Sequence, residues 1–188
     1  MAVQSFLSAV EAGSVERVAA MVIESQLALL IGVEDSTGEL MADLVDGGVP
    51  VGVARNFWEA LSDSFEPFAG SDLTGWRIGS DRAVIVDGVT YVFVEIKHDL
   101  GSTELVAVET ANGWVVDLMA SFGHAFAPVF NHWLQTGPAN EAIWGPVLAD
   151  QETSIEMAID RTDSDSVYQQ DLDRFLESVI RLQPVKPE

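Results

Sequence analysis

The stretch VTYVFVEIKHDLGSTELVAVETANGWVVDL, residues 89–118, decides the fold of this chain. From 89 to 98 the side chains alternate between two faces, which is typical of a strand, and the more apolar face carries Val92, Val94 and Ile96. Turn residues at 99–102 precede a strand predicted at 103–110. The triplet Ala111-Asn112-Gly113 is a hairpin signal, and a further strand is predicted at 114–119. Because short turns join consecutive strands, the sequence predicts a curved antiparallel meander.

Other elements are predicted on both sides of this stretch. Shorter strands are expected at 76–78 and 82–86, with Asp87-Gly88 as the turn that follows them. The spacing of apolar residues predicts a helical pair over 3–31, which Gly13 interrupts and in which Ser14 caps the second helix. A short helix at 38–45, a loop at 46–52 and a helix at 53–65 complete the N-terminal part. After the sheet, helices are predicted at 124–134, at 146–159 and beyond a cap at Asp165 or Ser166.

The charge balance excludes some classes of function. The 188 residues include 30 Asp plus Glu against 9 Lys plus Arg, for a net charge of -21, and the chain has no Cys. Binding to nucleic acid or to an anionic membrane needs cations that this chain lacks, so neither partner is expected. A solvated acidic surface is the first interpretation, with salt adaptation and mimicry of nucleic acid as alternatives. No export signal and no membrane span are expected, so we predict a cytoplasmic protein.

The order of the predicted elements carries a family resemblance. Phe6-Leu-Ser-Ala-Val-Glu-Ala-Gly-Ser-Val-Glu-Arg-Val-Ala-Ala-Met-Val22 resembles the opening helix pair of the NTF2-like (cystatin-like α+β, SnoaL-type) superfamily. Glu109-Thr-Ala-Asn-Gly-Trp-Val-Val-Asp-Leu118 is similar to its final hairpin. The resemblance implies an α+β fold in which N-terminal helices and a curved meander enclose a cone-shaped pocket. It implies an NTF2-like core at 1–120 and leaves a helical extension at 121–188, which we expect to pack on the core.

The chemistry-bearing residues form no standard catalytic motif. For the acidic cluster of Asp160, Asp163 and Asp165, helix capping is favoured over a calcium site, and no metal or cofactor is expected. The His residues make no metal set either. Within the resemblance, a pocket carboxylate would be the natural acid or base, and the candidates are Asp63, Glu95 and Asp117. For Glu95 and Asp117, the strand alternation also allows a position that simply faces water.

A ligand site is predicted at the wide end of the cone. Trp58, Arg77, His98 and His124 are its candidate residues, because helix and strand ends converge there. Arg55, Arg77 and Arg82 lie close together in sequence, which suggests either surface ion pairs or a pocket for an anionic ligand. The competing interpretation is an interior that large side chains fill completely.

Three classes of function remain open. A non-catalytic small-molecule-binding or protein-interaction module is favoured, because no set of catalytic residues can be recognised in the sequence. An isomerase-type or dehydratase-type enzyme that transfers a proton is the alternative, and an acidic mimic of nucleic acid is a remote third. A small apolar or anionic ligand is expected. A homodimer is also expected, since the C-terminal amphipathic helices exceed what the core needs to cover itself.

Overall fold

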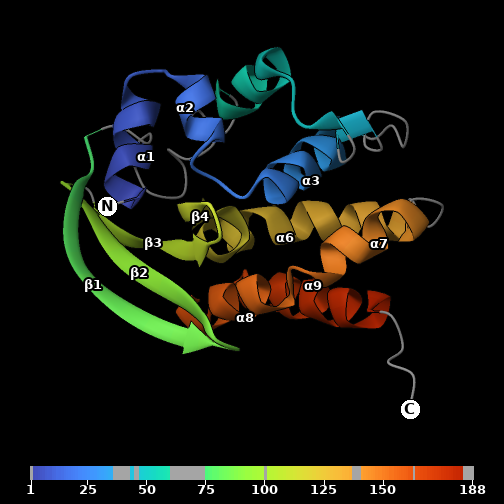
Figure 1. Ribbon diagram of the computed structural model, residues 1–188. Helices are drawn as coiled ribbons and strands as arrows, with labels where there is room; N and C mark the ends of the chain where they lie inside the picture. Colours follow the sequence, from blue (N-terminus) through green and yellow to red (C-terminus); the bar gives the residue numbers. More distant parts are fainter. Residues whose placement is uncertain are drawn as a thin grey trace. The chain divides into compact units, whose positions relative to one another are not determined.

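One antiparallel sheet organises the part of the chain that the structure describes. The structure is a computed structural model that describes residues 2–35, 43–44, 47–59, 75–99, 101–136, 141–162 and 164–183. Its four strands are paired in chain order: β1 Arg77–Val86, β2 Val89–His98, β3 Gly101–Thr110 and β4 Gly113–Asp117. The ribbon shows the strongest bend along β1 and β2 (Figure 1). The described residues therefore form an α+β protein with a meander sheet, and both predictions are confirmed.

The turns explain why the strands pair in this register. Asp87 and Gly88 both have positive φ, 50° and 81°, which matches the twist that a two-residue hairpin requires. Gly113, at φ 115°, begins β4 directly after the 111–112 turn, so the predicted hairpin at Asn112-Gly113 is confirmed. The two strands predicted at 76–78 and 82–86 are one strand, because an irregularity between Ile78 and Asp81 interrupts the register without ending the pairing.

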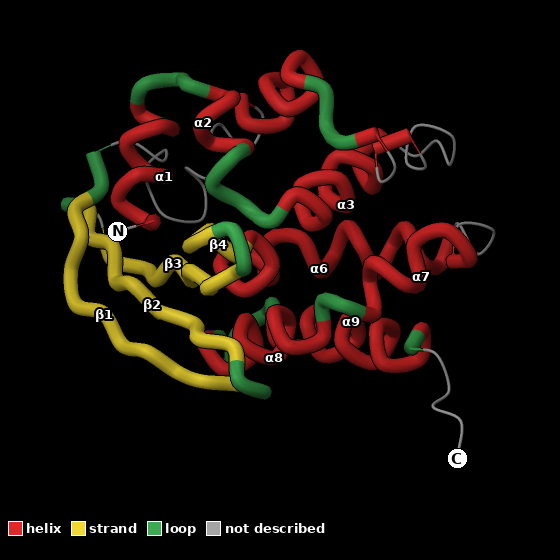
Figure 2. The backbone as a smooth tube through the Cα atoms, in the orientation of Figure 1, coloured by secondary structure: helices red, strands yellow, loops and turns green. Residues whose placement is uncertain are grey.

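Helices precede the sheet, as predicted (Figure 2). They are α1 Ala2–Glu11, α2 Val15–Ala19, α3 Glu24–Asp35 and a helix at 51–59. The predicted pair over 3–31 is wrong in number, because the second helix is interrupted at 20–23, where the Met21 carbonyl accepts from the Val116 N–H at 2.7 Å. Gly13 has φ 61° between α1 and α2, a conformation that suits glycine and turns the chain after the first helix. Ser14 stands at the N-cap of α2 without a side-chain capping bond. The helix predicted to begin at 53 begins at 51, and residues 60–65 of that prediction lie outside the described residues, as does most of 38–45.

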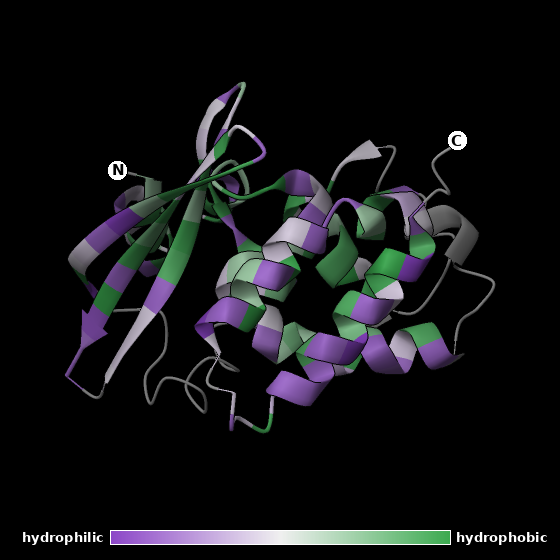
Figure 3. Ribbon diagram, turned by 90° about the horizontal axis from the view of Figure 1, so that it is seen from below, coloured by the Kyte–Doolittle hydropathy of each residue, from purple (hydrophilic) through white to green (hydrophobic). Residues whose placement is uncertain are grey.

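Both faces of the central strands are buried. Val94, Ile96, Leu105 and Val116 on the predicted interior face have no exposed surface, and α1 packs on β3 and β4. Hydrophobic and hydrophilic residues alternate along the strands (Figure 3), yet Tyr91 and Phe93 on the opposite face are also buried. The guanidinium of Arg82 lies 3.8 Å from the centroid of the Phe93 ring. A cation–π contact therefore covers one of these opposite-face residues.

The C-terminal part is helical. Its helices are α6 Leu118–Thr136, α7 Glu141–Ala149, α8 Glu152–Arg161 and α9 Gln169–Leu182. The strand predicted to reach 119 ends at 117, where α6 begins. The single helix predicted at 146–159 is wrong, because a turn at 150–151 separates α7 from α8. Phe130 of α6 stacks on Phe175 of α9, with ring centroids 4.7 Å apart and planes only 9° apart, and both rings are fully buried.

The chain divides into two compact units. The first comprises Met1–Leu27 and Val49–Ser121, and the second Ala28–Gly48 and Phe122–Glu188. The second unit thus includes residues 28–48 as well as the C-terminal helices. That the helical extension packs on an NTF2-like core stays a prediction. Among the described residues, no helix has both the length and the apolar character that crossing a bilayer requires.

Candidate functional site

The Trp58 cavity lies in the first unit. It has a volume of about 320 Å³, and its walls come from the end of α1, the turn after it, α2 and the 51–59 helix. The lining residues are Ala9, Val10, Gly13, Val15, Val18, Arg55, Trp58 and Glu59. Most of the wall is therefore apolar, with an indole, a cation and a carboxylate supplied by one helix.

Packing holds the Trp58 ring in place. The ring meets those of Phe6 and Phe57 edge to face, at centroid distances of 5.9 and 5.1 Å, and the residue is only 7% exposed. Its indole Nε1 is buried and has no hydrogen-bond partner in the described part of the chain. A buried donor left without an acceptor costs about 1 to 3 kcal/mol.

The two charged residues of the same wall, Arg55 and Glu59, are exposed. Arg55 and Glu59 stand one helical turn apart, and neither forms an ion pair with a residue that the structure describes. A guanidinium without a carboxylate partner can accept the anionic or polar end of a ligand. Trp58, predicted from the sequence, and Arg55, predicted as a possible anion-binding group, thus line one cavity.

Arg77 and His98 lie elsewhere in this unit. Arg77 donates to Asp99 at 2.6 Å, and both side chains are largely exposed. The ring of His98 lies against Trp76, with centroids 5.4 Å apart, at the end of β2. The Trp58 cavity is lined by neither residue. Of the two interpretations of Arg77, a surface ion pair or an anion-binding group, the structure therefore favours the ion pair.

His124 belongs to the second unit. Its ring meets Tyr168 edge to face at 5.7 Å, between α6 and the segment before α9. Burial, and after it the positive charge of Arg161, together lower the pKa of His124 from its usual 6.5 to about 4. His124 is therefore neutral at pH 7. A single site formed by all four predicted residues stays a prediction.

The candidate carboxylates are held by partners. Asp117 is only 1% exposed, so the alternative that it faces water is wrong. Its Oδ1 accepts from the Gln26 side-chain amide and from the Ala120 N–H, both at 2.8 Å. The Glu95 carboxylate accepts hydrogen bonds from Lys97 and from Ser80. These bonds lower the pKa of Glu95, and the bond from Lys97 has the largest effect. Asp63 lies outside the described residues.

Gln26 is a structural residue that the sequence analysis did not single out. Its Oε1 accepts from the main-chain N–H groups of Leu118 and Met119, at 2.7 and 3.3 Å. The first N–H groups of a helix have no partner within the helix, so Gln26 and Asp117 together satisfy the start of α6. The available signal was a glutamine inside the apolar run 21–33, where an unpaired polar group would be costly.

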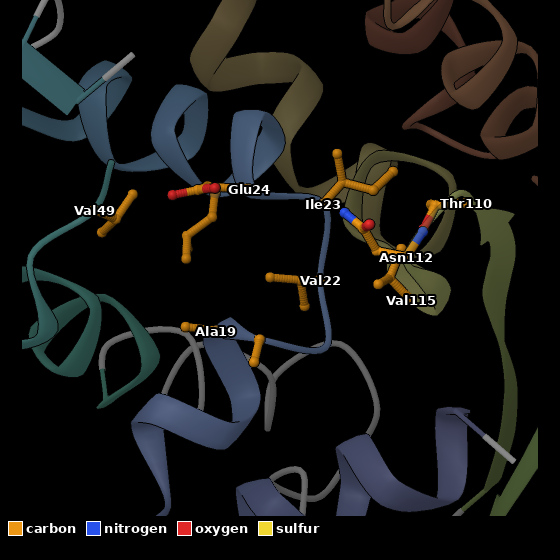
Figure 4. Close-up of a pocket in the computed structure, with 10 residues that line it drawn as sticks. Ala19, Val22, Ile23, Glu24, Val49, Thr110, Asn112 and Val115 are labelled. Carbon is orange, nitrogen blue, oxygen red and sulfur yellow. The ribbon is translucent and has the colours of Figure 1, made fainter. Parts of the chain in front are cut away.

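The α3 cavity also lies in the first unit and has a volume of about 500 Å³. It is lined by Ala19, Ala20, Val22, Ile23, Glu24, Leu27, Val49, Thr110, Asn112 and Val115. The close-up shows Ala19, Val22, Glu24 and Val49 around one open space (Figure 4). Ile23, Asn112 and Val115 lie beyond the segment that joins α2 to α3. No signal in the sequence pointed to this cavity, because its walls come from three separate parts of the chain.

Neither a metal centre nor a known relative defines the site. In the described part of the chain, no group of three or more His, Asp or Glu residues is placed to hold a metal ion. No protein-family model matches the chain, and no curated protein or solved structure matches it. The residues that line the Trp58 cavity and the α3 cavity are therefore the ones that bear on function.

Proposed function

We propose that this protein is a non-catalytic small-molecule-binding module of NTF2-like type, whose ligand occupies the Trp58 cavity. The apolar walls of that cavity, with the exposed guanidinium of Arg55 among its lining residues, carry the proposal. Helices followed by a curved antiparallel meander support the NTF2-like type. A volume of about 320 Å³ is within the range of ordinary ligand pockets, and apolar walls with a few polar groups are their usual composition.

The wall chemistry favours a ligand with an apolar body and one hydrogen-bond acceptor. Val10, Val15 and Val18 offer apolar surface, and the exposed guanidinium of Arg55 offers hydrogen-bond donors. Arg55 at the same wall favours an acceptor that carries negative charge, such as a carboxylate or sulfonate. This chemistry fits the small apolar or anionic ligand expected from the sequence.

The same geometry gives less support to the alternative, an enzyme that transfers a proton. Asp117 and Glu95 are both engaged by hydrogen-bond donors, and neither lines a cavity of the first unit described above. Glu59, which does line the Trp58 cavity, is exposed. A catalytic carboxylate usually owes its shifted pKa to burial or to a neighbouring charge. Binding without chemistry is therefore the better account of the Trp58 cavity.

A dye with the required chemistry tests the proposal. The probe is 8-anilinonaphthalene-1-sulfonate, which combines aromatic rings with a sulfonate, and binding is followed by its own emission on titration. Trp58→Phe replaces the indole by a smaller ring at the cavity wall, and it should weaken binding about fourfold, the worth of apolar contact equal to about one buried CH₂ group. Arg55→Gln should also weaken binding.

The matched control is Trp114→Phe. Trp114 is 41% exposed on β4 and does not line the cavity, so this change should leave dye binding as in the wild type. Near-ultraviolet circular dichroism verifies that each variant keeps its tertiary structure. If Trp58→Phe and Arg55→Gln both bind the dye as the wild type does, the ligand does not occupy this cavity and the proposal fails.

A further inference from the structure

The α3 cavity differs from the Trp58 cavity in the charge of its wall. Among the described residues that line it, Glu24 is the only charged one, and the others are apolar apart from Thr110 and Asn112. Glu24 is exposed and makes no ion pair with any described residue. Thr110 is already engaged, since its hydroxyl donates to the Gly113 carbonyl at 2.7 Å and accepts from the Asn112 N–H at 3.2 Å. The carboxylate of Glu24 is thus the charged group that the described wall offers to a ligand, beside the neutral amide of Asn112.

We propose that the α3 cavity binds a small organic ammonium ion, with the cation beside Glu24 and an apolar body against Val22 and Val49. Figure 4 shows these three side chains around the same open space. Val22 is 5% exposed and Val49 is half-buried, so both offer fixed apolar surface. A carboxylate beside apolar surface matches a molecule that carries one positive charge on a hydrophobic group.

Charge complementarity selects the cation over an anion of the same size. The chain carries a net charge of -21, so its field concentrates cations near the surface and repels anions. In the Trp58 cavity Arg55 opposes that field locally, whereas no lining residue of the α3 cavity is cationic. The two cavities therefore favour ligands of opposite charge, and this second site is independent of the proposed function.

Three aromatic probes of similar size test the charge preference. They are benzyltrimethylammonium, benzyl alcohol and benzenesulfonate, titrated with backbone amide resonances as the readout. The ammonium probe should shift the resonances of Ala19, Val22 and Val49, the alcohol should bind more weakly, and the sulfonate should leave these resonances unmoved. Added salt should weaken the ammonium probe, because mobile ions screen exposed charges.

Glu24→Gln tests the contact between the Glu24 carboxylate and the ammonium group of the probe. An ion pair at an exposed site is worth little, so this change should weaken the ammonium probe about two- to fivefold. The matched control is Glu16→Gln, which removes an equal charge from the first turn of α2, at an exposed residue outside the cavity. It should leave the affinity unchanged.

Each outcome decides the proposal. Loss of affinity in Glu24→Gln but not in Glu16→Gln, together with preference for the ammonium probe, supports it. Equal effects of the two variants would show that net charge alone attracts the probe, and shifts outside the lining residues would place it elsewhere; either result overturns the site. Trp58→Phe should not change binding of the ammonium probe. Failure of the dye experiment at the Trp58 cavity would therefore leave this result standing.

Discussion

Replacing Gln26 by Met should be among the most destabilising conservative changes in the first unit. The Gln26 side chain is fully buried, 91 residues in sequence from Asp117, and it contacts the start of α6 through both ends of its amide. Methionine has a similar length without branching, so packing is largely kept while the hydrogen bonds are lost.

The size of the loss follows from the groups left unpaired. The Leu118 N–H at 2.7 Å and the donation to Asp117 at 2.8 Å are short bonds, and the Met119 N–H at 3.3 Å is a weaker one. An unsatisfied buried polar group costs about 1 to 3 kcal/mol. Asp117 Oδ1 keeps the Ala120 N–H, so its share of the loss is one hydrogen bond to a charged acceptor, worth about 1.5 to 3 kcal/mol. With the unpaired Leu118 N–H and a fraction for Met119, the total is about 3 to 5 kcal/mol, a large part of the stability of an ordinary domain.

The measurement is the free energy of unfolding in urea, followed by circular dichroism and tryptophan emission. The matched control is Gln169→Met, because Gln169 donates to Asp173 at 3.0 Å at an exposed position. This control should cost no more than about 0.5 kcal/mol. Combining Gln26→Met with Asp117→Ala should cost less than the sum of the two, since both remove the same bond. A loss below about 1 kcal/mol, or equal to that of the control, would refute the assigned role.

Two further predictions concern the second unit. Because the folded pKa of His124 is depressed, His124 contributes stability above pH 6.5 that is lost as the pH falls toward 4, by about 3 kcal/mol at most. His124→Gln should remove this dependence, whereas His132→Gln, on the exposed side of α6, should keep it; equal pH profiles for wild type and His124→Gln would contradict the assignment. Gly123→Ala would place a methyl group 2.9 Å from Ala158 Cβ and should lower the free energy of unfolding by about 1 to 3 kcal/mol. Gly145→Ala meets only an ordinary 3.7 Å contact with Leu182 and should be neutral or stabilising, so equal melting temperatures for the two variants would contradict close packing of α6 on α8.

The sheet was predictable because its signals are local. Alternation over 89–98 repeats within the strand itself, and Asp87-Gly88 and Asn112-Gly113 favour turns through their own backbone conformations. The left-handed conformation of Gly13 explains in the same way why the first helical segment was correctly divided. Each of these features depends on neighbours a few residues away, so the sequence alone contains the information.

The break between α7 and α8 was harder to predict from the sequence. Residues 146–159 are rich in helix formers, and the turn at 150–151 includes no Gly or Pro that would mark it. Gln151 is 4% exposed in spite of its polarity, and its side chain donates to the Val147 carbonyl at 3.1 Å. Packing and a side-chain bond to the preceding turn thus decide a boundary that propensity does not show.

By itself, then, the sequence determined the α+β class, the order of the strands and the turns between them, because periodicity and turn chemistry act over short distances. Only the tertiary structure decided that Tyr91 and Phe93 are buried on the second face of the sheet and that Asp117 pairs with Gln26 instead of facing water. It also decided that Trp58 and Arg55 line the same cavity. Burial and hydrogen-bond satisfaction depend on which distant segments meet, and no local pattern encodes those meetings.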